Sequence, residues 1–196
     1  MNKQKYITSA FEIVTTLTTG FGGFLVAIAP PEEADAKFAV GISSFLSLVI
    51  FLFIAAIAKR KASLRHWKYW LGISGLFLLT FAISIYIYRN NFAHLTFLFP
   101  PDDIEQVRLI NGTEYTPKAV QILKENPDLT FAELLDKLGG ENQRHKIWTQ
   151  ESIENATNVL LYNYIIMILS LTISVFCITE GVSLKYSNIE KKKTIV

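Results

Sequence analysis

The chain has 196 residues, 51% of them hydrophobic and 18% charged, and its net charge at pH 7 is +2. This weak balance gives no global basic field, so direct binding of nucleic acid is not predicted. A single cysteine, Cys177, excludes a disulfide within the chain. Charged residues are nearly missing from four long stretches, whereas a soluble protein carries them along every surface helix.

These four apolar stretches predict transmembrane helices. A helix needs roughly 20 residues to cross the hydrocarbon core, and a helix satisfies all its backbone hydrogen bonds within the membrane. The stretches are Ile7–Ala29, Phe38–Ala58, Trp70–Tyr88 and Val159–Glu180. We therefore expect a mainly α-helical integral membrane protein with four transmembrane helices. A small α+β polar domain is expected between the third and fourth.

The spans divide the chain into three parts. Residues 1–90 form a three-helix transmembrane region, residues 91–157 a polar extramembrane domain, and residues 158–196 the fourth transmembrane helix with a basic tail. An alternative concerns the first span, because Lys3 and Lys5 before an apolar run that ends in Ala27–Ala29 resemble a cleavable signal peptide. Glu12 inside this run and Pro30 after it argue against cleavage.

Lysine and arginine placement predicts the orientation. The loop after the second span has five basic residues and no acidic one, and both tails are basic. The insertion from residue 89 to 157 has seven basic and eleven acidic residues. We expect a multi-pass inner (plasma) membrane protein with cytoplasmic termini and an extracytoplasmic domain. An anionic lipid or a cytoplasmic protein is the expected contact of the basic loop residues, which are Lys59, Arg60, Lys61, Arg65 and Lys68.

Polar and small residues recur at helical spacing inside two spans. One face of the first span carries Thr8, Glu12, Thr15, Thr19 and Gly22, and the fourth span carries Ser170 and Ser174. Such faces are typical of close helix packing, because small residues let backbones approach and hydroxyls hydrogen-bond between helices. The alternative is that the face with the carboxyl group lines a water-filled path in a homo-oligomer. Both interpretations stay open at this point.

The polar insertion has the sequence signals of a small folded domain. Leu95–Phe99 predicts a strand, and Val107–Tyr115 predicts a hairpin with a type I′ turn at Asn111-Gly112. Thr116-Pro117 begins a predicted helix that ends near Glu125. A capping box at Thr130–Glu133 begins a second helix, which Gly139-Gly140 ends. A last helix is expected to start near Thr149 and to run unbroken into the fourth span.

Catalytic and metal-binding patterns are weak. The three histidines are far apart, and no spacing typical of a metal, nucleotide or other cofactor site is present. Asp102, Asp103 and Glu105 form an acidic cluster that fits a solvated turn better than a cation site. Arg89 and His94 match a ribonuclease spacing, but an interfacial anchor explains the arginine. We expect a protein without enzymatic activity.

The polar domain, which is inserted between the third and fourth spans, contains the segments Gly112–Pro117, Ala132–Leu135 and Trp148–Ser152. The arrangement of four spans with one inserted polar domain resembles that of the small multi-pass membrane proteins encoded beside bacterial phage-defence systems. In size and span count it is most similar to the four-span accessory proteins of type VI-B CRISPR loci. The resemblance is one of architecture and carries over no catalytic residue. It implies an accessory that perturbs the inner membrane or modulates an effector.

Two functional hypotheses follow. In the first, an oligomer in the lipid bilayer perturbs membrane integrity or forms a pore lined by the first span. In the second, the chain is a membrane-anchored binding or regulatory module whose outer domain or basic loop engages a partner.

Overall fold

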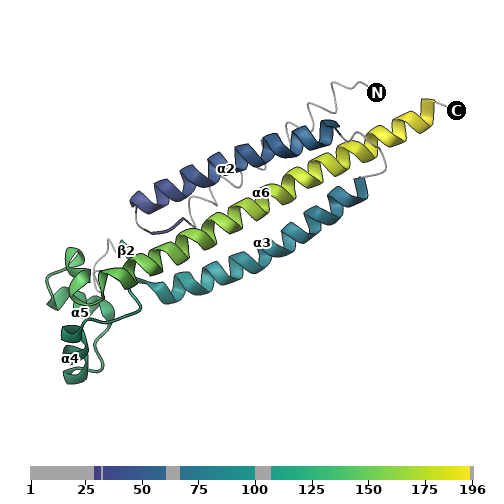
Figure 1. Cartoon of the computed structure of the whole chain (residues 1–196). Helices are drawn as coiled ribbons and strands as arrows, with labels where there is room; N and C mark the ends of the chain where they lie inside the picture. Colours follow the sequence, from purple (N-terminus) through teal and green to yellow (C-terminus); the bar gives the residue numbers. More distant parts are fainter. Residues whose placement is uncertain (1–28, 32, 61–66, 100–106, 195–196) are drawn as a thin grey trace. The chain divides into compact units, whose positions relative to one another are not determined.

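A computed structural model describes the chain except for residues 1–28, 32, 61–66, 100–106 and 195–196 (Figure 1). Two units divide the described part. The helical unit contains Val40–Ser84 and Ile165–Val196, and the domain unit contains Pro30–Ala39 and Ile85–Tyr164. The described elements are α2 (Glu33–Arg60), α3 (Trp67–Leu95), β1 (Thr96–Phe99), β2 (Val107–Ile110), α4 (Pro117–Glu125), α5 (Phe131–Lys137), a 3₁₀ helix η1 (Glu141–Lys146) and α6 (Gln150–Thr194).

Three of these helices are long and apolar enough to cross a membrane. The apolar segments are Lys37–Ile54 in α2, Trp67–Leu95, which is all of α3, and Gln150–Tyr186 in α6. They correspond to the second, third and fourth predicted spans. The first predicted span, Ile7–Ala29, lies outside the described residues, so the count of four stays a prediction. Both α3 and α6 extend further toward the domain than their apolar cores indicated.

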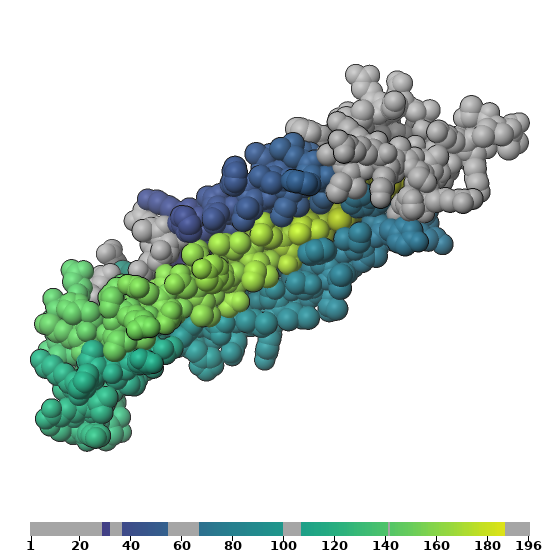
Figure 2. All heavy atoms as spheres, in the orientation of Figure 1, coloured from purple at the N-terminus to yellow at the C-terminus, as the bar shows by residue number. Residues whose placement is uncertain are grey.

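The helical unit is built around α6, which lies between α2 and α3 (Figure 1). In the space-filling view their side chains form three adjacent bands, with α6 in the middle (Figure 2). On α2 and α3 many of the large apolar side chains are exposed, as expected for lipid contact. α6 has a larger buried share than either neighbour. The fourth predicted span is therefore the central helix of the described bundle.

The domain unit contains a two-stranded antiparallel sheet. Thr96 of β1 pairs with Ile110 of β2, and Phe99 pairs with Val107. This pairing corrects the predicted hairpin, because β2 pairs with the preceding strand and not with residues 113–115. A type I′ turn needs positive φ at both central residues, and neither Asn111 nor Gly112 has it. The Asn111 amide instead donates to the Leu95 carbonyl, 2.9 Å away.

Local sequence signals explain the two short helices. The Thr116 hydroxyl accepts a hydrogen bond from the Ala119 amide at 3.3 Å, and Pro117 begins α4 at a position where no amide hydrogen is needed. α5 has the complete predicted capping box between Thr130 and Glu133. Both helices start where they were predicted to start, because capping requires only neighbouring residues.

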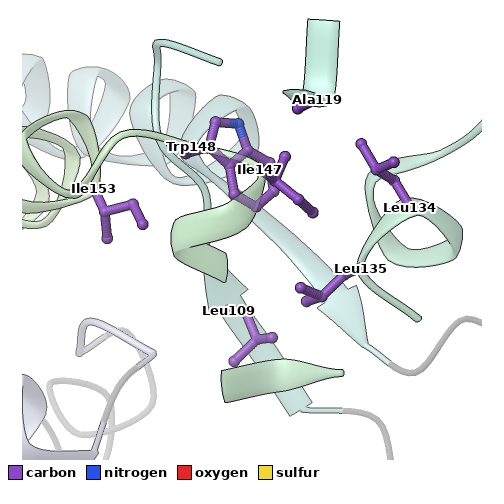
Figure 3. Packing of buried hydrophobic residues seen from close by; sticks show 7 residues of the cluster. All are labelled: Leu109, Ala119, Leu134, Leu135, Ile147, Trp148 and Ile153. Carbon is purple, nitrogen blue, oxygen red and sulfur yellow. The ribbon is translucent and has the colours of Figure 1, made fainter. Parts of the chain in front are cut away.

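The core of the domain surrounds Trp148 (Figure 3). The indole is 1% exposed, and the rings of Phe97 and Phe131 lie 5.6 and 5.5 Å from it, centroid to centroid. Other side chains of the buried cluster come from β2, α4, α5, the residue after η1 and α6, and they are Leu109, Ala119, Leu134, Leu135, Ile147 and Ile153. The insertion thus has a hydrophobic core of its own.

Candidate functional site

The two serines predicted in the fourth span lie inside the helical unit. Ser174 is buried, and its hydroxyl lies 3.0 Å from the Ser74 hydroxyl and 3.1 Å from the Ser74 carbonyl oxygen, to which it donates. Ser170 is also buried, and its hydroxyl donates to the Ile166 carbonyl of its own helix. A second pair, Ser47 and Thr172, joins α2 to α6 at 3.1 Å. The two pairs that join different helices are typical of helix packing, whereas the Ser170 bond lies within α6.

Of the other predicted site residues, the structure describes only some. The face of the first span, Thr8, Glu12, Thr15, Thr19 and Gly22, lies outside the described residues, as do Lys61 and Arg65. Lys59 and Arg60 belong to the last turn of α2. Lys68 is exposed in the first turn of α3, where its ammonium lies 5.8 Å from the centre of the Trp67 ring.

A candidate site missed at the sequence level lies where residues 114–116 pair with residues 146–149. The Thr116 amide donates to the Ile147 carbonyl at 2.7 Å, and the Thr149 amide donates to the Glu114 carbonyl at 3.0 Å. Between these bonds, Tyr115 forms an antiparallel bridge with Trp148. The pairing fixes the Tyr115 backbone on both sides, so its side chain starts from a rigid position.

Tyr115 is the most exposed ring that packs on Trp148. Its ring stacks on Trp148 with centroids 6.4 Å apart and also lies 6.4 Å from Phe131. The side chain is 38% exposed, whereas Trp148 behind it is 1% exposed. A rigid, partly exposed aromatic ring that is backed by a packed core is typical of residues that dominate protein interfaces. The signal for this site was weak, because sequence alone does not indicate that Tyr115 and Trp148 are neighbours.

Outside the candidate spans, the described residue with a shifted pKa is a helix-capping glutamate. Two hydrogen bonds from Thr130, the backbone bond being the stronger influence, lower the pKa of the Glu133 carboxyl below its ordinary value. This carboxylate is a helix cap, fully at the surface. Among the residues that the structure describes, no three His, Cys, Asp or Glu side chains are placed to hold a metal ion. The acidic cluster Asp102, Asp103 and Glu105 lies outside the described residues.

No protein-family model, curated protein or solved structure matches this chain. Its function must therefore be inferred from its own residues. Their arrangement offers helix-packing hydroxyls in the helical unit and an aromatic docking point, Tyr115, in the domain unit.

Proposed function

We propose that the chain is a non-enzymatic, membrane-anchored binding module whose domain recognises a protein partner through the surface around Tyr115. The observation that carries the proposal is the continuity of α6 from Gln150 to Thr194. Ile153, at the start of this helix, belongs to the domain core, whereas Ser174 is hydrogen-bonded within the helical unit. One helix thus supplies residues both to a folded domain and to a candidate membrane span.

The Tyr115 surface supports a role in binding. Its backbone is fixed by pairing with residues 146–149, so ordering it on binding requires little conformational entropy. The tyrosine has an apolar ring and a hydroxyl that suits a partly wet interface. Val120 in α4 is equally exposed and adds apolar surface to the same domain.

The proposed topology places the domain outside the cell and both termini in the cytoplasm. The three described candidate spans support part of this arrangement on their own. If each crosses the membrane once, the basic connection between α2 and α3 shares a side with the carboxyl-terminal tail, and the domain lies opposite. Cytoplasmic Lys and Arg then follow the usual bias of plasma membrane proteins.

Photo-cross-linking in cells tests the binding proposal. A benzophenone amino acid replaces Tyr115 in the full-length chain, and irradiation is followed by mass spectrometry of the adducts. We expect one predominant protein adduct, because a specific interface presents the same partner surface to the probe in every molecule. The same probe at Lys124, an exposed position near the end of α4, serves as the matched control and should give little of this adduct.

Two outcomes would contradict the proposal. One is a set of adducts that is the same from positions 115 and 124, which would indicate random collision. The other is the absence of any protein adduct at position 115 while the chain is correctly inserted and its helix content is unchanged.

The alternative function is that of an oligomeric effector that perturbs membranes in phage defence. This proposal is based on the sequence. Its central residue, Glu12, lies outside the described residues, and the resemblance that motivates it is architectural. A membrane-potential dye tests it during induced expression of the activated protein. The alternative is supported if the wild type depolarises the membrane and if Glu12→Gln reduces this depolarisation severalfold. A normal membrane potential during expression of the wild type contradicts it.

A further inference from the structure

Two ammonium groups converge on one indole ring where α3 begins. The Lys68 ammonium lies 5.8 Å from the centre of the Trp67 ring, and the Lys185 ammonium lies 5.2 Å from the same centre. Both distances are within the range of cation–π attraction. Lys68 is the sequence neighbour of Trp67, but Lys185 comes from α6, so this cluster exists only in the folded helical unit. We call these three residues the Trp67 cluster.

A glycine allows α6 to come close enough for this arrangement. A Cβ at Gly181 would lie 3.1 Å from Leu71 Cδ2 and 3.3 Å from the Trp67 carbonyl oxygen, both tighter than ordinary van der Waals contact. Lys185 follows one helical turn later on the same side of α6. The position of its ammonium over the indole therefore depends on the close contact at Gly181.

The Trp67 cluster concentrates positive charge that the indole offsets only in part. Two like charges that share one ring repel each other, and cation–π attraction is modest at exposed positions. Both lysine side chains are exposed, and neither pairs with a carboxylate among the described residues. Trp67 is also the first residue of α3, and the amino end of a helix has positive potential. The charge pattern is complementary to an anion.

The cluster also lies at the ends of two candidate spans. The apolar segment of α3 begins at Trp67, and that of α6 ends at Tyr186. The exposed Tyr69 and Tyr186 flank it with rings of the kind that sit at headgroup level. An anion at this depth is the phosphate of a phospholipid. A zwitterionic headgroup fits poorly, because its trimethylammonium meets two lysines, whereas an anionic headgroup has no such repulsion.

We propose that the Trp67 cluster is a binding site for the headgroup of an anionic phospholipid. The two ammonium groups contact the phosphate, and the indole holds them at the level of the interface. The inference is independent of the proposed partner binding at Tyr115, because it concerns a different unit and a different ligand.

Native mass spectrometry of the purified full-length chain tests the proposal. The protein in detergent is titrated with phosphatidylglycerol or with phosphatidylcholine of the same acyl chains. Because each interfacial lysine contributes about fivefold in affinity for an anionic surface, the two together predict a preference of about 25-fold for phosphatidylglycerol. Lys68→Gln or Lys185→Gln should each lower this preference about fivefold, and the double variant should nearly abolish it.

Three controls separate the site from net charge and from misfolding. Lys118→Gln with Lys124→Gln removes the same charge from exposed positions on α4 and should leave the preference unchanged. Lys68→Arg with Lys185→Arg should preserve it. Gly181→Val retains both charges but forces α6 away from α3, so the preference should fall. Circular dichroism verifies that each variant keeps its helix content.

The proposal is wrong if the glutamine double variant keeps the preference of the wild type. It is also wrong if the α4 double variant loses the preference equally, because net charge then explains it. Inorganic phosphate in excess is added as a last arm. Displacement of phosphatidylglycerol by phosphate would show a general phosphate site and overturn the lipid assignment, whereas undiminished lipid binding supports it.

Discussion

Thr130 and Glu133 show how few residues are needed to begin a helix. The Thr130 amide and hydroxyl both donate to Glu133 Oε2 at 2.8 Å, and the Glu133 amide donates back to the hydroxyl at 3.3 Å. All four groups lie within one turn. This local closure is why the sequence predicted the start of α5 correctly.

The capping box predicts a pH-dependent stability of α5. Because folding lowers the pKa of Glu133, the unfolded chain binds more protons than the folded chain near this pKa. The stabilisation is therefore complete above pH 4.5, the ordinary value of the carboxyl pKa, and is lost as the pH falls through the lower folded-state value. Thr130→Ala should weaken this pH dependence and destabilise the helix by about 1 kcal/mol at neutral pH.

Hydrogen exchange of peptides that cover residues 130–138 measures this effect, after correction for the intrinsic rate at each pH. Gln121→Ala, at an exposed position of α4, is the control and should leave the exchange of α5 unchanged. Equal acid sensitivity in the wild type and in Thr130→Ala would show that the capping box is not its source.

Gly112 is required by packing. A Cβ at this position would overlap Ser152 Oγ and would lie 2.6 Å from Trp148 Cβ. Trp148 is buried in the domain core and has no room to move, so Gly112→Ala should destabilise the domain by about 1–3 kcal/mol. Pulse proteolysis of the purified chain in urea measures the change. Gly75→Ala, where no atom lies within 4 Å of the added Cβ, should have no such effect, and equal losses in both variants would contradict the packing argument.

At the scale of elements, α6 is joined to both of its neighbours by hydroxyl pairs. One pair links Ser74 of α3 to Ser174, and the other links Ser47 of α2 to Thr172. Lipid offers no hydrophobic force between helices, so such contacts and close packing hold a bundle together. Of the two serines predicted in the fourth span, Ser174 forms one of these pairs, whereas Ser170 bonds within α6. The polar face of the first span lies outside the described residues.

A double-mutant cycle measures the Ser74–Ser174 pair. Ser74→Ala and Ser174→Ala together should show a coupling energy of about 0.6 kcal/mol, the usual size for hydrogen bonds between membrane helices. Steric-trap unfolding in bicelles gives the free energies. Ser44→Ala is the control, because its hydroxyl bonds to the Val40 carbonyl of its own helix. Coupling between Ser44 and Ser74 as large as that between Ser74 and Ser174 would contradict a specific contact.

The elements also show where sequence reasoning fails. Asn111-Gly112 has the strongest composition for a tight hairpin, yet its backbone lacks the positive φ that this turn needs. Asn111 is buried, and its side-chain amide donates to the His94 carbonyl at 3.3 Å. Gly112 packs against Trp148 instead. The tertiary contacts of these two residues therefore outweigh their local preference for a type I′ turn.

At the scale of the molecule, the continuity of α6 can be tested by measuring a distance along the helix. Spin labels at Ile166 and Val182 lie 16 residues apart on this helix, both within the helical unit, which corresponds to about 24 Å at 1.5 Å per residue. Double electron–electron resonance on the chain with Cys177→Ser should give a narrow distribution near this distance. Insertion of four glycines after Ile173 should broaden it, because glycine weakens the helix. A broad distribution in the uninterrupted chain would contradict a continuous helix.

The sequence by itself determined the features that depend on neighbours in the chain. Apolar length marked the three described spans, capping residues marked α4 and α5, and the absence of proline and glycine from Thr149 to Glu180 marked the long α6. Each follows from local physics, because a helix satisfies its backbone within itself.

Only the tertiary structure decided which distant residues meet. It paired β2 with β1, brought Tyr115 onto Trp148, and brought Lys185 over Trp67. Such contacts depend on how a whole chain fills space around a core or within a bundle, and no local propensity encodes them. The two proposed binding surfaces both arise from contacts of this kind, which is why the sequence indicated their residue types but not their sites.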